Sequence, residues 1–377
     1  MGSRVTDEEA ARVRGEGVDV LPLTAYPVRQ LPQHVVDVAK EAVIHSQNTP
    51  SRGLLELREA ISKNILKLTG VMVDPASEVL VTYGAMHALN VVMQSILDPG
   101  DEVVLYTPSY FFDGIIRMAG GHPVHVPLQK ADGYRFNIEL LERRLTGRTK
   151  AILINSPVNP TGYVASQRDL TVIAELAGKY GRVIISDESY DRLVYDGERH
   201  TSFLEVPGAK ERTILVKSFT KSYALPSWRV GYVVADRLLT ESFVKTLEWN
   251  NLYCSFVAQK VAAAAMSGPQ EWLAGVAEEF QYNRDMFLRV IEGTESISVV
   301  PPKGGPFLFI DISQLPLSCE EVSQSLLERF GLVSTPGSCH FSSNHIRLPF
   351  GGTRETIMKA VDRLEEAFNF LEGRCSK

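Results

Sequence analysis

Three residues in the middle of the chain supply an amine, a carboxylate and an amide, and each follows a stretch typical of a β-strand. Asp187 ends the apolar run VIIS, Lys221 lies just beyond the run TILVK, and Asn159 lies in the segment NSPVNPTG, residues 155–162. Prolines restrict φ and the final glycine permits a tight exit, so this segment is expected to hold Asn159 in a rigid loop. Open α/β sheets bind ligands at the carboxyl ends of their strands. We therefore expect Asn159, Asp187 and Lys221 to meet at one edge of a sheet.

The residues around Lys221 are suited to binding an anion. Ser218 and Thr220 precede it, and Arg229 follows it in the segment SWRVGY, residues 227–232. The segment TYGAM, residues 82–86, is typical of a strand that enters a helix, whose free N–H groups bind phosphate. An amine, a carboxylate, a phosphate cradle and an asparagine together describe a site for pyridoxal 5′-phosphate. The alternative is a buried salt bridge between Lys221 and Asp187, because such groups are seldom buried unpaired.

The elements that must position these residues alternate between strand and helix. We expect strands at residues 78–83, 102–106, 150–155, 182–187, 213–217 and 229–235, and helices at residues 53–68 and 168–180. In the first helix, Leu57, Ile61 and Ile65 recur at steps of four and form an apolar stripe. Ser166 would cap the second helix. The alternation predicts an α/β fold with a mostly parallel sheet sandwiched by helices.

The last hundred residues follow a different pattern. A long helix near residues 270–292 is expected to precede strands at residues 306–313 and 345–349 and a helix at residues 353–371. This pattern predicts a smaller α+β domain. We expect a large cofactor-binding domain at residues 46–285 and a small domain built from both chain ends, residues 1–45 plus 286–377. No Pro- or Ser-rich linker separates the two, so they are expected to pack tightly.

A short helix is also expected at the start of the chain. Thr6 would cap it, and acidic residues follow in its first turn. Such a segment is commonly a solvated chain end. The alternative is a mobile lid in which Glu8 or Glu9 reaches a cationic substrate.

Composition excludes several classes of protein. Of the 377 residues, 44% are hydrophobic and 22% are charged, which is typical of a soluble globular chain. The net charge of −6 argues against nucleic-acid binding, and no apolar run approaches the roughly 18 residues of a membrane span. The chain has neither a CxxC pair nor an HExxH motif, so no metal site is expected. We expect a cytoplasmic enzyme that acts on small molecules.

In combination, the segments NSPVNPTG, SDESYDRLVY and SFTKSYALPSWRVGY resemble those of fold-type I pyridoxal phosphate enzymes of the class I/II aminotransferase family. The resemblance extends from about Pro32 to Arg347. It implies an enzyme that moves an α-amino group from an amino acid to a 2-oxo acid, through an aldimine of Lys221 and a quinonoid. It also implies a homodimer with the active site at the interface.

The resemblance further implies a role for each residue of the site. Lys221 would form the internal aldimine and then move protons between the substrate Cα and the cofactor C4′. Asp187 would keep the pyridine nitrogen protonated, and Arg347 would clamp the substrate α-carboxylate. The other expected contacts are Tyr110 on the ring face, Asn159 and Tyr190 at the phenolic oxygen, and Ala85, Met86, Ser218, Thr220 and Arg229 at the phosphate.

The sequence departs from the family pattern at three positions. Ala25 takes the place of a glycine, Tyr26 replaces an acid, and Asn48 stands where the family usually supplies a phosphate-binding tyrosine to the partner subunit. These departures keep a second reaction class open, namely β- or γ-elimination, replacement or cyclisation. Some cyclases that act on hydroxylated arginine share a P-S-x-G stretch like residues 50–53 of this chain. Transamination remains the first expectation.

A regulatory role is not expected, and three residues are candidates for the substrate pocket. Aminotransferase-like transcription regulators carry a fused DNA-binding module, and the chain leaves no room for one before the pattern begins at residue 23. By position, Tyr26, Arg29 and His87 are the candidates for contacting a substrate side chain.

Overall fold

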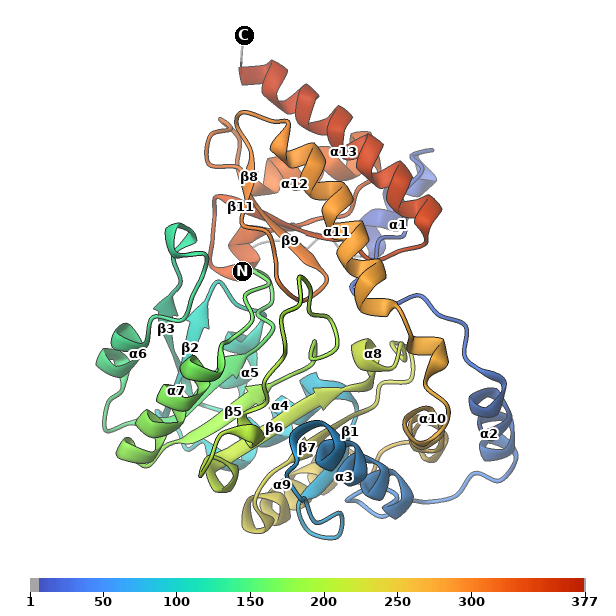
Figure 1. Cartoon of the computed structure of the whole chain (residues 1–377), viewed down its shortest axis with the longest axis vertical. Helices are drawn as coiled ribbons and strands as arrows, with labels where there is room; N and C mark the ends of the chain where they lie inside the picture. Colours follow the sequence, from blue (N-terminus) through green and yellow to red (C-terminus); the bar gives the residue numbers. More distant parts are fainter. Residues whose placement is uncertain (1–6, 376–377) are drawn as a thin grey trace.

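The structure, a computed structural model, describes residues 7–375, and the largest element in it is a seven-stranded sheet (Figure 1). The strand order is β1-β7-β6-β5-β4-β2-β3. The strands are β1 (Val79–Thr82), β2 (Glu102–Thr107), β3 (His122–Pro127), β4 (Thr149–Asn155), β5 (Val183–Asp187), β6 (Thr213–Ser218) and β7 (Gly231–Val234). Of these seven strands, β7 alone runs opposite to the other six, so the predicted mostly parallel sheet is confirmed.

Helices cover both faces of this sheet, as the near-continuous apolar strands predict. One face packs against α4 (Gly84–Ile96), α5 (Phe112–Met118) and α9 (Arg237–Asn251). The other face packs against α3 (Leu55–Thr69), α6 (Ile138–Arg144), α7 (Gln167–Tyr180) and α10 (Phe256–Ser267). Successive strand residues alternate between the two faces, as Leu153 and Ile154 of β4 do.

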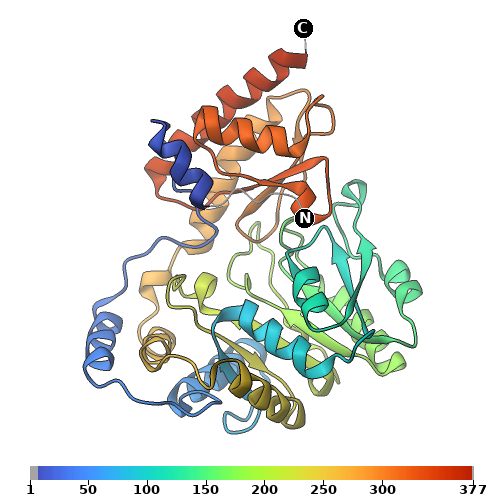
Figure 2. The same cartoon turned by 180° about the vertical axis from the view of Figure 1, so that it is seen from behind.

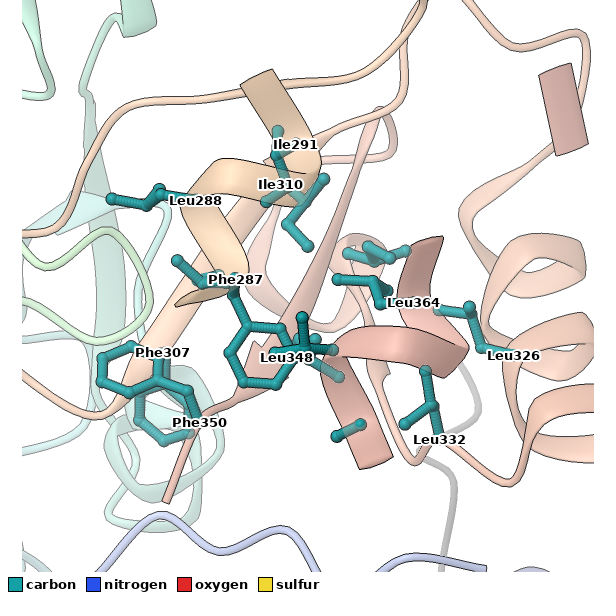
Figure 3. Close-up of a cluster of buried hydrophobic side chains, with 14 of the residues drawn as sticks. Phe287, Leu288, Ile291, Phe307, Ile310, Leu326, Leu332, Leu348, Phe350 and Leu364 are labelled. Carbon is teal, nitrogen blue, oxygen red and sulfur yellow. The ribbon is translucent and has the colours of Figure 1, made fainter. Parts of the chain in front are cut away.

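A second, four-stranded antiparallel sheet has the order β10-β11-β9-β8. Its elements are β8 (Ser298–Val299), β9 (Phe307–Asp311), β10 (Thr335–Pro336) and β11 (His345–Pro349), packed against α11 (Val276–Glu292), α12 (Cys319–Phe330) and α13 (Arg354–Cys375). Figure 3 shows Phe287 of α11, Leu348 of β11 and Leu364 of α13 in this cluster. Because side chains alternate along β11, Arg347 points away from this core.

Local sequence signals set several helix ends. Ser166 caps α7, as the sequence predicts, and forms a capping box with Asp169. The helix predicted near residue 270 begins only at Val276, because a short 3₁₀ turn comes first and Gly275 adopts a φ of 69°. The 3₁₀ turns are η1 (Lys130–Asp132), η2 (Phe203–Glu205), η3 (Lys210–Arg212), η4 (Glu271–Leu273) and η5 (Gly337–His340).

The N-terminal segment divides its packing between the two sheets (Figure 2). Helix α1 (Asp7–Gly15) buries Ala10 and Val13 against Leu327 of α12, so it is neither a solvated end nor a free lid here. Thr6, its predicted cap, lies outside the described residues. Helix α2 (Gln33–Ile44) instead packs against α10 and buries Val35 beside the large sheet. The division into residues 46–285 and 1–45 plus 286–377 stays a prediction.

Candidate active site

The ends of five strands form one edge of the large sheet. Asn155 at the end of β4 is the register partner of Asp187 at the end of β5. Ser218 at the end of β6 pairs with Gly231 of β7, which in turn pairs with Thr82 at the end of β1. The polar residues that sequence reasoning assigned to strand ends therefore lie in one row.

A cavity opens at this edge of the sheet. It is lined by all ten residues predicted for catalysis and cofactor binding, which are Ala85, Met86, Tyr110, Asn159, Asp187, Tyr190, Ser218, Thr220, Lys221 and Arg229. Phe112, Asn155 and Ser189 also line it and had no predicted contact. Arg347 is not part of this lining, but it donates a hydrogen bond to Asn159, which is.

Lys221 presents its amine from α8 (Phe219–Ser222), a helix of only four residues that follows β6. Ser218 caps this turn, since its hydroxyl accepts a hydrogen bond from the Thr220 N–H at 3.2 Å. Lys221 Nζ lies 5.4 Å from the centre of the Tyr26 ring and 5.8 Å from that of Tyr190. Burial, and then the positive charges of Arg347 and Arg229, lower the pKa of Lys221 to about 7. A large fraction of the amine is therefore unprotonated, and nucleophilic, at neutral pH.

Asp187 supplies a buried carboxylate to the cavity lining. Its Oδ1 accepts hydrogen bonds from the Ser189 N–H at 3.0 Å and from the Ser189 hydroxyl at 2.6 Å. Burial raises the pKa of Asp187 to about 6. Within residues 7–375 no Lys, Arg or His forms an ion pair with Asp187, so the salt bridge to Lys221 considered above is wrong. The contact with Ser189 could have been predicted, because an aspartate side chain commonly accepts a hydrogen bond from the backbone N–H two residues later.

The helix N-terminus at Gly84 and the Arg229 guanidinium form a cationic end of the cavity. Ala85 and Met86 lie in the first turn of α4, where backbone N–H groups have no partner within the helix. Arg229 Nη1 donates to the Thr220 hydroxyl at 3.3 Å. Gly84 has a φ of 78°, and a Cβ there would lie 2.7 Å from Arg229 Nη2. Only glycine therefore allows the guanidinium to approach the helix start.

Arg347 connects the small sheet to the cavity. Its Nη1 donates to Asn159 Oδ1 at 3.0 Å, its Nη2 donates to the Thr335 hydroxyl at 3.2 Å, and its guanidinium lies 4.3 Å from the centre of the Phe307 ring. Asn159 Nδ2 in turn donates to the Tyr190 hydroxyl at 3.1 Å. Sequence reasoning missed Thr335 and Phe307, which carry no motif.

The NSPVNPTG loop is held by the two asparagines that flank its first proline. Asn155 Oδ1 accepts from the Asn159 N–H at 2.8 Å, and Asn155 Nδ2 donates to the Asp187 carbonyl at 3.0 Å. Asn155 thus fixes Asn159 relative to the end of β5. This explains why an asparagine occurs on each side of the proline.

The remaining candidates lie elsewhere. Arg29 forms an ion pair with Glu279 at 2.6 Å, and His87 Nδ1 accepts from the Tyr83 N–H at 3.1 Å. Asn48 Oδ1 accepts from the Tyr253 hydroxyl at 2.6 Å and does not line the cavity. Of the three residues named for the substrate side chain, only Tyr26 lies beside Lys221.

No helix within residues 7–375 is long and apolar enough to cross a membrane. No group of three or more His, Cys, Asp or Glu side chains in that range is arranged to hold a metal ion.

The charges of the cavity fit pyridoxal phosphate. Arg229 lines the cavity and Arg347 borders it, so two guanidinium cations lie there beside the Lys221 amine, while Asp187 is a buried carboxylate without a counter-cation among the described residues. A phosphate at Arg229, a protonated pyridine nitrogen at Asp187 and a substrate carboxylate at Arg347 would balance these charges.

Comparison with known proteins identifies the family. Residues 18–364 match the family described as aminotransferase class I and II. The chain is 32% identical to the aspartate aminotransferase of Geobacillus stearothermophilus over 377 residues, covering 97% of this chain and 95% of the relative. It is 33% identical to the aspartate aminotransferase of Pyrococcus abyssi, with 89% and 88% of the two chains covered.

Solved structures agree with this result. The aspartate aminotransferase of Thermus thermophilus with maleate superposes with a TM-score of 0.89 at 30% identity, over 96% of this chain and 95% of that one. The aromatic aminotransferase of Pyrococcus horikoshii OT3 gives a TM-score of 0.88 at 31% identity, over 96% and 99%. The resemblance stated from the sequence is therefore confirmed, and the chain belongs to the class I and II aminotransferase family.

Proposed function

We propose that this protein is a pyridoxal phosphate-dependent aminotransferase that transfers the α-amino group of an amino acid to a 2-oxo acid. The observation that carries this proposal is the convergence of Lys221, Asp187 and Arg229 on one cavity, with Arg347 at its border. Relatives over nearly the whole chain are named aspartate aminotransferases, which supports transamination. The same names do not favour the alternative of elimination, replacement or cyclisation.

Each residue of the cavity has a task in this proposal. When bound, pyridoxal phosphate supplies a conjugated ring that accepts the electron pair left at the substrate Cα. Lys221, whose lowered pKa leaves much of its amine neutral, would hold the cofactor and would take up and return the proton of the substrate Cα. Asp187 holds a proton on the ring nitrogen, and Ser189 keeps that carboxylate oriented.

Different residues would bind the cofactor phosphate, the cofactor ring and the substrate α-carboxylate. Ser218, Thr220, Arg229 and the first N–H groups of α4 bind the phosphate. Asn159 and Tyr190, which are hydrogen-bonded to each other, would hold the phenolic oxygen, and Tyr110 would contact the ring. Arg347 binds the α-carboxylate in a planar, two-pronged contact, so this carboxylate is retained and decarboxylation is disfavoured.

Aspartate with 2-oxoglutarate is the first substrate pair to test, because several relatives are named for aspartate. Single amino acids should be incubated with the purified holoenzyme, with and without 2-oxoglutarate, and the products measured by mass spectrometry. A transaminase stops after one half-reaction when no 2-oxo acid is present. Continued turnover without 2-oxoglutarate would overturn the proposal in favour of elimination or cyclisation. The Lys221→Ala variant is the control for reaction on free cofactor.

We also propose that the enzyme is a cytoplasmic homodimer with a large domain and a small domain assembled from both chain ends. The family resemblance supports the dimer, and the two separate hydrophobic clusters around the two sheets support the two domains. The packing of α2 on α10 favours a boundary that precedes α2. Light scattering on the purified protein should give a mass of about twice 41.8 kDa, and a monomer mass would contradict the dimer.

A further inference from the structure

A buried ion pair lies behind Lys221 and has no task in the proposed reaction. Lys217 Nζ is 2.6 Å from Asp191 Oδ2, and the two side chains are only 9% and 6% exposed. The other oxygen of this carboxylate, Oδ1, accepts a hydrogen bond from the Ser222 hydroxyl at 2.7 Å. One carboxylate therefore binds both a strand residue and a helix residue.

Each of these three residues is the neighbour of a cavity residue. Asp191 follows Tyr190, Lys217 precedes Ser218, and Ser222 follows Lys221. They come from the loop after β5, from β6 and from α8. Because side chains alternate along β6, Ser218 faces α4 while Lys217 points to the other face of the sheet, where Asp191 meets it. The ion pair thus joins the three segments that carry the reactive groups without entering the cavity.

The helix that carries Lys221 needs such support. An isolated helix of one turn is unstable, because nucleation fixes several residues for a single hydrogen bond. Ser218 fixes the first end of α8 by accepting from the Thr220 N–H. The Ser222 hydroxyl fixes its last residue through Asp191. Lys221 lies between these two fixed points.

We propose that Asp191 is the positioning residue of Lys221: held by Lys217, it binds Ser222 and so aims the Lys221 amine into the cavity. The charge of Lys217 makes this possible, because an unpaired carboxylate would not remain ionised at such a buried position. Consistent with this arrangement, Lys217 and hydrogen bonds keep the pKa of Asp191 at about 2, despite burial. The proposal rests on the proposed function only in taking Lys221 as the reactive amine.

The simplest test removes the tie to α8 and leaves the ion pair intact. Ser222→Ala should slow the capture of pyridoxal phosphate by the cofactor-free protein, followed by absorbance, and should lower kcat roughly 10- to 100-fold with little change in KM for the amino acid. Ser222→Thr keeps a hydroxyl and should restore both rates. Ser62→Ala is a matched control. Ser62 lies on α3, away from the cavity, and its hydroxyl donates to the Val73 carbonyl at 2.7 Å.

A pair of double variants separates positioning from stability. Lys217→Met with Asp191→Asn removes both charges but keeps an oxygen that can accept from Ser222. Lys217→Met with Asp191→Leu removes the charges and the acceptor together. The first double variant should capture the cofactor at close to the normal rate, and the second should be as slow as Ser222→Ala, at comparable Tm.

Two results would overturn the proposal. One is that Ser222→Ala captures the cofactor and turns over like Ser62→Ala. The other is that the two double variants have equal capture rates, which would leave the ion pair with a stabilising role only. Cofactor capture needs no amino acid, so it stays informative if the reaction proves not to be transamination. If Lys221→Ala still captures the cofactor covalently, the proposed function fails instead.

Discussion

The cofactor side and the substrate side of the cavity are built in different ways. The cofactor side takes Asp187, Ser218 and Lys221 from the ends of neighbouring strands and the turns that follow them. The substrate side takes Tyr26 and Arg347 from opposite ends of the chain: Tyr26 lies beside the Lys221 amine, and Arg347 donates to Asn159. Under the proposed function, cofactor binding would depend on local geometry, whereas substrate selection would depend on how distant segments pack.

The substrate side is also held by contacts with the small sheet. Thr24 forms a two-way backbone pair with Gly351 at 2.8 and 2.9 Å, just after β11. The Leu21 N–H donates to the Gly331 carbonyl at 2.9 Å. Tyr26 and Arg347 therefore belong to one packed unit. A change in that unit should alter substrate binding more than it alters cofactor binding.

The largest expected effect is on the cofactor side. Lys221→Ala should remove the covalent cofactor linkage and lower kcat by about 10⁴-fold, the upper end for loss of a general acid–base group. Absorbance of the purified protein and borohydride trapping, followed by peptide mass spectrometry, would check the linkage. A trapped linkage at another lysine would contradict the assignment.

Asp187→Asn should have the next largest effect, because it keeps the shape and removes the charge that faces the ring nitrogen. We expect kcat to fall by roughly 10²- to 10³-fold, as for loss of one preorganised electrostatic group. Asp187→Glu, which keeps the charge, should be less impaired. Steady-state kinetics at saturating cofactor would make the comparison, and equal rates for Asp187→Asn and the native enzyme would refute this role.

Arg347→Gln tests the substrate side directly. Loss of a charge-assisted hydrogen bond of about 1.5–3 kcal/mol should raise KM for the amino acid roughly 10- to 100-fold. The Kd for pyridoxal phosphate should change little. Arg354→Gln is a suitable control, since Arg354 lies at the start of α13 and outside the cavity. A larger change in cofactor Kd than in KM would remove the distinction between the two sides.

The pH dependence of cofactor capture should reflect both titrating groups. Lys221 has a pKa of about 7, so capture should accelerate as pH rises through 7, when the amine loses its proton. Asp187 has a pKa of about 6, so affinity for the ring should weaken as pH falls through 6, when the carboxylate becomes neutral. Arg229→Gln removes a nearby positive charge and should move the Lys221 midpoint upward. A midpoint near that of an ordinary lysine in the native protein would contradict this account.

Tyr26 should give the smallest effect. Its ring faces the Lys221 amine at 5.4 Å, and such a contact contributes about 0.5–1 kcal/mol at a partly exposed site. Tyr26→Leu should therefore change kcat/KM only several-fold, while Tyr26→Phe, which keeps the ring, should remain near the native value. Ratios of kcat/KM for aspartate and an aromatic amino acid would show whether this ring also selects the side chain.

Much of the cofactor side could be predicted from the sequence. The strand ends at Asp187 and Ser218 follow from apolar runs, and the register then places them in one row. The rigid loop at Asn159 follows from its prolines. These residues are close in sequence to the elements that position them, so a pattern of a few residues contains most of the information.

The rest depended on packing that no short pattern contains. Nothing around Thr335 or Phe307 indicates that they hold the Arg347 guanidinium. Likewise, the burial of α1 on α12 depends on Leu327, far along the chain from Val13. Tyr26 lies over Lys221 two residues after Thr24, which pairs with Gly351 near the other end of the chain.

Gly84 limits how this protein can evolve. A Cβ at this position would collide with the Arg229 guanidinium, and the positive φ is one that other residues rarely adopt. No single substitution at position 84 can therefore preserve the present geometry of the anion-binding end. A side chain at position 84 would therefore displace the guanidinium from the first N–H groups of α4 and weaken the proposed phosphate site.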